Sequence, residues 1–190
     1  LVSVIIVSYN SREWLEECLP SLFEQDYRPL EVIVVDNGST DDALTWVRGN
    51  YPEVRCLALG PGKSLAHALN RGVELASQEA VGVEHNEYHE YKGYYLLLNP
   101  DVRLAPGAIT RLVQTAASDR KCAAVGAKLR FWWAPAFLNG LGNRVGPFSW
   151  GTDNALGHLD LGQFDDWQEL PSACFAEKEG TFSNTERRVQ

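Results

Sequence analysis

The chain has 190 residues, and its 25 acidic side chains outnumber its 17 basic ones, which gives a formal net charge of −8. Hydrophobic residues make up 45% of it, enough for one sizeable core in a chain too short for two comfortable domains. The acidic balance excludes nucleic acid as the expected partner, because such a surface needs basic side chains to neutralise phosphates. Anionic nucleotides stay among the candidate ligands, provided that a divalent cation lies between them and the protein.

The sequence carries no pattern for membrane insertion or secretion. No apolar run approaches the ~20 residues that a membrane span needs, and no charged-then-apolar leader precedes the first strand pattern. The cysteines are far apart and form no CxxC pair, which favours reduced thiols in a cytoplasmic protein: Cys18, Cys56, Cys122 and Cys174. Because the chain has no Met and begins within a strand pattern, we expect a trimmed domain or a fragment.

Apolar, β-branched runs alternate with helical patterns along the first two thirds of the chain. The runs predict strands over residues 2–8, 30–35, 54–59, 94–98 and 122–129. The intervening segments predict helices over residues 11–25, around 46–47, over 64–77 and from 106 to 117. This alternation predicts an α/β fold with a mainly parallel sheet and helices on both faces. Ligands of such sheets bind beyond the carboxyl ends of the strands, so polar residues that follow a strand are the candidates for a site.

The pattern changes after residue 131. Gly, Pro, Trp and Asn accumulate, and residues 145–177 contain several acidic side chains but no Lys or Arg. We expect an irregular region over residues 131–178, beside the mouth of the crevice, and a frayed polar tail over 179–190.

Two polar clusters follow the first two predicted strands. The first is Ser-Tyr-Asn at 8–10, and the second is Asp-Asn-Gly-Ser at 36–39. The Asp36 carboxylate can accept hydrogen bonds from the N–H groups of a base or from a sugar hydroxyl. The second cluster is also a good turn followed by a helix cap, and taken alone that structural interpretation is the stronger one. A receiver domain built on Asp36 is disfavoured, because the paired acids expected after its first strand are missing.

The third cluster is Gly-Pro-Gly-Lys-Ser at 60–64, between a strand and a helix. It resembles a phosphate loop, but that motif requires glycine at the position of Leu57. The difference argues against a Walker-type ATPase. Lys63 beside a helix N-terminus can still face a phosphate, and a tight turn with a solvated lysine explains the residues equally well.

The fourth cluster, Asn-Pro-Asp at 99–101, ends a fully apolar strand. A carboxylate fixed there by proline can hold Mg²⁺ or Mn²⁺ that bridges a diphosphate, since such cations take few protein ligands and keep several waters. An Asx turn at the end of the strand is the alternative, and Asp101 alone does not decide between them. A zinc helix at His85 and His89 is disfavoured, because the metalloprotease motif has Glu directly after the first His. An exposed acidic insertion over 79–91 is the better interpretation.

In their order and spacing, the segments VSVIIVSYN, LEVIVVDNGSTD and LLLNPDV resemble the donor-site motifs of the family 2 glycosyltransferases, which have the GT-A fold. The form NPDV, in place of the more general Asp-x-Asp, is similar to the rhamnosyltransferase subgroup. The resemblance covers roughly residues 2–130 and continues loosely through DLGQFDDW. It implies a GT-A type, Rossmann-like sheet with a nucleotide-sugar (donor) binding region over 1–130. A partial acceptor region of the same domain would follow over 131–178.

The resemblance also implies roles for individual residues. Asp36 would bind the base, uracil or thymine, with Ser39 close by. Asp101 would coordinate Mg²⁺ or Mn²⁺, and Asn99 takes the place of the family's first acidic ligand. The other donor-binding residues, of which Lys63 or Arg71 would lie near the diphosphate, are Ser8, Tyr9, Asn10, Lys63, Asn70 and Arg71.

The implied reaction is inverting transfer of a sugar from a UDP- or dTDP-linked nucleoside diphosphate sugar to a saccharide or lipid-linked acceptor. A carboxylate would remove the acceptor's proton. The family's later Glu-Asp motif, which supplies this base, is not found in the sequence, and Asp165 and Asp166 are the nearest substitutes. A catalytically incomplete nucleotide-sugar-binding module or fragment explains the same motifs. The family also implies polysaccharide biosynthesis at the cytoplasmic face of the cell membrane, and leaves peripheral association with that membrane open.

Overall fold

The structure is a computed structural model that describes residues 1–78, 93–119, 122–145 and 151–164. The chain divides into two compact units, Leu1–Thr110 and Arg111–Gln190. Within the described ranges, no helix is long and apolar enough to cross a lipid bilayer.

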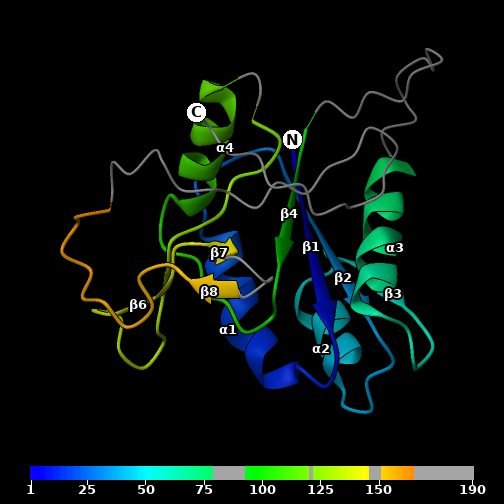
Figure 1. Cartoon of the computed structure of the whole chain (residues 1–190). Coiled ribbons are helices and arrows are strands. Elements are labelled where there is room, and N and C mark those ends of the chain that lie inside the picture. Colours follow the sequence, from blue (N-terminus) through cyan, green and yellow to red (C-terminus); the bar gives the residue numbers. More distant parts are fainter. Residues whose placement is uncertain (79–92, 120–121, 146–150, 165–190) are drawn as a thin grey trace. The chain divides into compact units, whose positions relative to one another are not determined.

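The first unit is built around a parallel sheet, which Figure 1 shows with its strands side by side. Its described strands lie in the order β3-β2-β1-β4. The strands are apolar and rich in β-branched residues, and β1 and β2 are buried along most of their length, as parallel strands covered on both faces are. Their bounds are β1 (Val2–Ser8), β2 (Leu30–Asp36), β3 (Arg55–Ala58) and β4 (Tyr94–Leu98).

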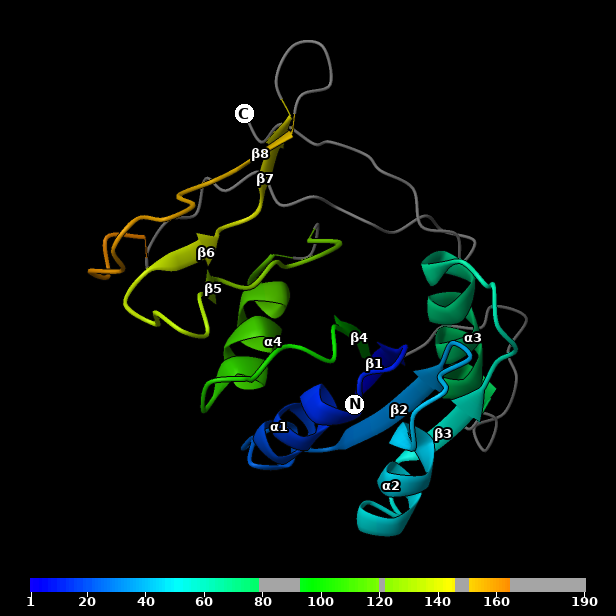
Figure 2. The same ribbon diagram turned by 90° about the horizontal axis from the view of Figure 1, so that it is seen from below.

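Helices connect these strands and cover both faces of the sheet. α1 and α2 join strands that step in one direction, from β1 to β2 to β3, whereas α3 returns from β3 to β4 on the far side of β1. Because such crossovers are right-handed, α1 and α2 lie on one face and α3 on the other, as Figure 2 shows. The predicted α/β class is thereby confirmed. The bounds are α1 (Arg12–Phe23), α2 (Ala43–Asn50), α3 (Leu65–Gln78) and, after β4, α4 (Ala108–Ser118).

The packing of α3 on the sheet depends on one glycine. Ala68 and Ala76 of α3 share a buried cluster with Ile5 and Val35 of the strands. Between the two alanines lies Gly72, where an added Cβ would come within 2.5 Å of Cγ2 of Ile5. The helix reaches this distance from the sheet only because residue 72 has no side chain.

The second unit contains most of α4 and two short antiparallel ribbons. β5 (Leu129–Arg130) pairs with β6 (Leu138–Gly140), and β7 (Asn143–Val145) pairs with β8 (Gly151–Asp153).

The strand predicted over residues 122–129 is wrong for most of its length. Residues 122–128 form no strand, and pairing begins only at Leu129, antiparallel to β6. The run contains Ala123, Ala124, Gly126 and Ala127, which have a weak preference for strands. An apolar run therefore looked like a buried strand although it has no strand partner in the described part of the chain.

Candidate functional site

The first two polar clusters lie side by side at the carboxyl edge of the sheet. Ser8 is in register with Asp36, and the backbone N–H of Asn37 donates to the Ser8 carbonyl at 2.8 Å. Asp36 is only 7% exposed. Its carboxylate accepts hydrogen bonds from the backbone N–H of Ser39, at 3.2 Å, and from the Ser39 hydroxyl. The turn that follows β2 therefore fixes the orientation of this buried carboxylate.

Asn10 ties the end of β1 to the same turn. Its backbone lies in the left-handed region, with φ of 49°, which asparagine tolerates better than most residues. Its N–H donates to the Ser39 hydroxyl at 2.9 Å, and its side-chain oxygen accepts from the backbone N–H of Thr40 at 2.8 Å. The neighbouring Tyr9 is 61% exposed. The strand end thus presents an exposed aromatic residue one position before Asn10, which is hydrogen-bonded to the turn that carries Asp36.

Asp41, at the end of the DNGSTD segment, has a structural role. One carboxylate oxygen accepts from the N–H of Ala43 at 3.2 Å, at the start of α2, and the other accepts from the N–H of Arg12 at 3.0 Å, at the start of α1. The helix-cap interpretation of the segment therefore describes Asp41, while Asp36 faces its own turn.

The loop that carries Lys63 lies directly on the Asp36 turn. The Asn37 side-chain amide donates to the carbonyl of Lys63 at 3.0 Å. Gly38 has a φ of 88°, and a Cβ added there would lie 2.7 Å from Cα of Pro61. The second and third polar clusters are thus joined through backbone contact, and the exposed Lys63 comes just before the N-terminus of α3.

Two residues of α3 are expected in the donor site: Arg71, near the diphosphate, and Asn70. The Arg71 guanidinium forms an ion pair with Glu74 on the exposed side of the helix. Among the described residues, it therefore pairs within its own helix and not with a residue of a strand-end cluster. The side-chain oxygen of Asn70 is buried and has no hydrogen-bond partner among the described residues. The same holds for the Ser8 hydroxyl and for the side-chain oxygen of Asn37. Unpaired buried oxygens are costly, and they are typical of places where water, an ion or a ligand completes the hydrogen bonding.

Asp101 follows β4, the strand on the opposite side of β1 from β2. It is exposed, as is Asn99, and no hydrogen bond or ion pair engages its carboxylate within the described ranges. Beneath this loop lies Cys18 of α1, whose Sγ is 4.0 Å from the carbonyl oxygen of Asn99. Burial, with a smaller contribution from the negative charge of Asp101, raises the pKa of the Cys18 thiol to about 12. The thiol is therefore protonated at neutral pH and contributes no charge of its own.

The oxygen atoms at this strand end fit a hard divalent cation. Asp101 offers a free carboxylate, and Asn99 offers a side-chain carbonyl. The described residues contain no group of three or more His, Cys, Asp and Glu side chains that could enclose a metal. A cation at Asp101 would therefore take most of its ligands from water and from a phosphate, as Mg²⁺ commonly does.

Polar side chains in the last turn of α1 and just beyond its end hold the loop that carries Asp101. The Ser21 hydroxyl accepts from the N–H of Leu104 at 3.0 Å. The Gln25 amide donates to the carbonyl of Ala105 at 3.0 Å and accepts from the N–H of Ile109 at 3.3 Å. The sequence motifs do not single out these residues. Their signal is helical spacing, because positions 18, 21 and 25 share one face of a helix.

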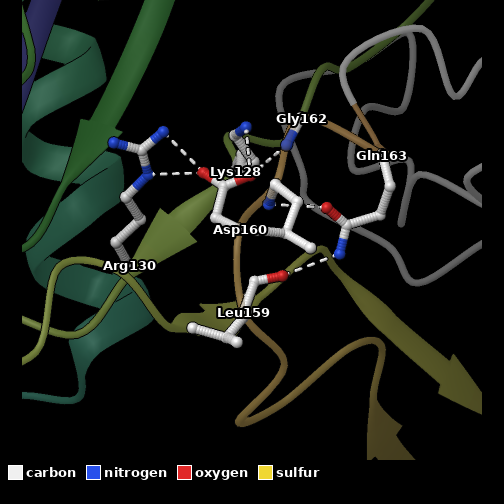
Figure 3. A network of polar contacts seen from close by, with 7 residues as sticks. Lys128, Arg130, Leu159, Asp160, Gly162 and Gln163 are labelled. Atoms are coloured by element: carbon white, nitrogen blue, oxygen red, sulfur yellow. Dashed lines mark hydrogen bonds and ion pairs between the residues drawn. The ribbon is translucent and has the colours of Figure 1, made fainter.

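In the second unit, Asp160 is the centre of an ion-pair network (Figure 3). Its side chain is 3% exposed and accepts from Lys128 Nζ at 3.0 Å and from Arg130 Nε at 2.7 Å. The hydrogen bond from Lys128, with those from Arg130 and the Gly162 N–H, lowers the pKa of this carboxyl although burial opposes the shift. Asp160 opens the DLGQFDDW segment. Of the other residues considered, Asp165, Asp166, His85 and His89 lie outside the described residues.

The chain was compared with known protein families. Residues 3–138 match the family described as glycosyl transferase family 2, a span that includes all four strand-end clusters. The chain belongs to glycosyl transferase family 2. The expected family is therefore confirmed.

Curated members of the family are similar to this chain over about two thirds of its length. The family 2 chain is 30% identical over 130 residues to N-acetylglucosaminyl-diphospho-decaprenol L-rhamnosyltransferase of Mycobacterium tuberculosis, which covers 68% of this chain and 41% of that protein. It is 31% identical over 129 residues to chondroitin synthase of Pasteurella multocida, which covers 66% of this chain and 12% of that protein. The chain thus spans less than half the length of these relatives.

A solved structure supports the fold. The mannosyltransferase PcManGT from Pyrobaculum calidifontis, in complex with GDP-Man and Mn²⁺, is similar to the family 2 chain with a TM-score of 0.53 and 29% identity. The similarity covers 68% of this chain and 35% of that one. Together with the parallel sheet, it establishes the fold as GT-A type.

Proposed function

We propose that the chain is the donor-binding part of an inverting glycosyltransferase, which moves a sugar from a nucleoside diphosphate sugar to a saccharide or lipid-linked acceptor. One observation carries the proposal: two carboxylates follow the strands on either side of β1, at the same edge of the sheet. Asp36 is buried and held by its turn, whereas Asp101 is exposed and has no bonding partner in the described part of the chain. The first suits a fixed hydrogen-bond acceptor, and the second suits a ligand for a cation.

The base of a UDP- or dTDP-linked donor would lie at Asp36. A carboxylate has about four lone-pair sites, and the contacts with Ser39 leave some of them for the N–H group of a pyrimidine. The exposed ring of Tyr9 is the adjacent surface on which a base can stack. Asn10 and Ser39 support both groups through the hydrogen bonds that join the two strand ends.

The diphosphate would lie between Asp101 and the N-terminus of α3. Asp101 and Asn99 are the residues that would hold Mg²⁺ or Mn²⁺, and PcManGT, which holds Mn²⁺ with GDP-Man, supports this choice. When bound, such a cation supplies positive charge that stabilises the departing diphosphate. Lys63, exposed just before α3, is the candidate for a direct contact with a phosphate, and Asn70 on the same helix offers an unpaired oxygen to the donor. Arg71 could join them only by leaving Glu74.

The acceptor is proposed from the relatives. The name of the Mycobacterium tuberculosis protein includes a diphospho-decaprenol, which supports a lipid-linked acceptor for this chain. An acceptor of this kind would bring the protein to the cytoplasmic face of a membrane as a peripheral component of polysaccharide biosynthesis.

A nucleotide-sugar-binding module without turnover is the second candidate. It is favoured by the state of Asp160, whose carboxylate is occupied by Lys128 and Arg130 and is not free to accept a proton from an acceptor hydroxyl. Asp165 and Asp166 remain the proposed bases for transfer. Release of UDP from a UDP-sugar in the presence of a saccharide acceptor would separate the two candidates.

Binding of UDP and dTDP, measured by calorimetry with and without Mn²⁺ and with ATP as a control ligand, tests the donor site. We expect a pyrimidine diphosphate to bind more tightly with Mn²⁺, and Asp101→Ala to weaken the Mn²⁺-dependent binding by about tenfold or more. Asp36→Asn should weaken binding in both conditions, because it acts on the base. Asp153→Ala removes an exposed acid of the second unit and should change neither. Tight ATP binding without a pyrimidine preference would refute the proposal.

A further inference from the structure

The loop between β4 and α4, residues 99–107, is attached on both sides of Asp101 to α1 and to Gln25, which lies just beyond the end of that helix. Before Asp101, the carbonyl of Asn99 contacts the Cys18 thiol. After it, the N–H of Leu104 is held by Ser21 and the carbonyl of Ala105 by Gln25. The Asp101 carboxylate itself lies between these attachments, and none of the residues that the structure describes bonds to it.

Gln25 is the strongest of these attachments. It is 3% exposed, and its amide nitrogen donates at 3.0 Å both to the Ala105 carbonyl and to the Ser21 carbonyl of α1, the helix just before it. The amide oxygen accepts from the N–H of Ile109 in the first turn of α4. Each end of the amide faces a group of the opposite kind, so the side chain has one orientation and fixes the loop against both helices.

Ser21 adds a second fixed point closer to Asp101. It is 4% exposed, donates its hydroxyl to the Cys18 carbonyl at 2.8 Å and accepts from the Leu104 N–H. Because both ends of the hydroxyl are used, a change at position 21 leaves the Leu104 N–H without its partner.

We propose that Gln25 and Ser21 are positioning residues for the divalent cation: through the backbone of residues 99–107 they hold the Asp101 carboxylate at the edge of the sheet. The inference rests on the proposed role of Asp101 as a cation ligand. A single carboxylate that must bind a cation together with waters and a phosphate gains affinity when its backbone is ordered before binding. Residues that contact neither the cation nor the nucleotide would then set the affinity for the cation.

The test measures Mn²⁺ affinity in the presence of UDP, by electron paramagnetic resonance of free Mn²⁺, with UDP affinity without metal as the second measurement. The single variants of the full chain are Gln25→Ala, Ser21→Ala and Asp101→Ala. In two double variants, Asp101→Ala is combined with Gln25→Ala or with Ser21→Ala. We expect Gln25→Ala and Ser21→Ala each to weaken Mn²⁺ binding by about tenfold, as is typical when the residues that support a metal ligand are lost. UDP binding without Mn²⁺ should not change. When Asp101 is already replaced by Ala, neither Gln25→Ala nor Ser21→Ala should weaken Mn²⁺ binding further.

Ser77→Ala is the matched control. It removes a hydroxyl that hydrogen-bonds the Tyr95 hydroxyl of β4 at 2.8 Å, on the other face of the sheet. We expect it to leave Mn²⁺ affinity unchanged. If Gln25→Ala and Ser21→Ala lower the melting temperature but keep the parent Mn²⁺ affinity, or if their effects persist without Asp101, the positioning role is refuted. Failure of the proposed function looks different, because Asp101→Ala itself would then leave Mn²⁺ affinity unchanged.

Discussion

Gly38 is the residue through which the turn after β2 and the loop after β3 meet. Its φ of 88° and its contact with the backbone of Pro61 both exclude a side chain. Gly62, in the same loop, has a similar φ of 79°, but nothing lies within 4 Å of the position that its Cβ would occupy. Substituting each glycine in turn therefore distinguishes the energetic cost of a left-handed backbone, which both positions have, from the cost of a clash with a neighbouring backbone, which only Gly38 has.

We expect Gly38→Ala to lower the free energy of unfolding more than Gly62→Ala does. Both place an alanine in a left-handed conformation, which costs about 1–2 kcal/mol. Only Gly38→Ala also pushes a methyl group into Pro61, so it should in addition displace the Asp36 turn and weaken UDP binding. Urea unfolding followed by tryptophan fluorescence, with UDP calorimetry, compares the two variants. Equal losses of stability would contradict the contact between the loops.

At the scale of elements, Gly72 in α3 and Gly49 in α2 can be compared in the same way. We expect Gly72→Ala to lower the free energy of unfolding by about 1–3 kcal/mol, because its methyl group would overlap Ile5 and force the helix from the sheet. Gly49→Ala in α2 should raise it by up to about 1 kcal/mol, because nothing lies within 4 Å of the added Cβ and alanine favours a helix. Thermal unfolding measures both, and a destabilised Gly49→Ala would contradict the open surroundings of that residue.

Most elements of the first unit follow from local pattern. The β-branched run over residues 2–8 is β1, and the apolar face of the first helix is α1. The sequence predicts a helix as far as Gln25, but α1 ends at Phe23. The N–H of Gln25 donates to the Leu22 carbonyl, and its side chain donates to the loop that carries Asp101. The strand predicted over residues 122–129 is wrong for most of its length, because a strand needs a pairing partner and the local sequence does not specify one.

The candidate site was predictable in part. The rule that ligands bind beyond the carboxyl ends of parallel strands places Asp36 and Asp101 at one edge, and β2 and β4 on either side of β1 agree with it. The contacts of Asn37 with Lys63 and of Gln25 with Ala105 were not predictable. A side chain that bonds a distant backbone group leaves no periodic trace in the sequence.

At the scale of the whole molecule, the Asp160 network makes stability depend on pH. The pKa of Asp160 lies below its ordinary value of 3.8 because Lys128 and Arg130 donate to the charged form. A carboxyl whose pKa is lower in the folded state adds stability that is fully present above the unfolded pKa and is lost as the pH falls through the folded one. The network should therefore stabilise the protein fully at neutral pH, and its contribution should begin to decline as the pH falls below 3.8.

We expect Asp160→Asn to lower the free energy of unfolding by about 1–2 kcal/mol at pH 7, a modest loss because the Arg130 side chain is half exposed and water screens its charge. The difference from the parent should shrink as the pH falls below 3.8. Urea unfolding between neutral pH and acid, with Asp153→Asn as an exposed control, measures it. A difference that stays constant with pH would mean that the charge of Asp160 does not stabilise the fold.

The strand order has a consequence for the order in which the chain can assemble. In β1, Val2 pairs with Leu30 on one side and with Tyr94 on the other. Closing a longer loop costs more entropy, so the parallel β1–β2 pairing forms at a smaller cost than the β1–β4 pairing. During synthesis, the residues of β1 and β2, with Asp36, leave the ribosome before Asp101 does. We therefore expect the Asp36 end of the proposed donor site to be able to form before the Asp101 end.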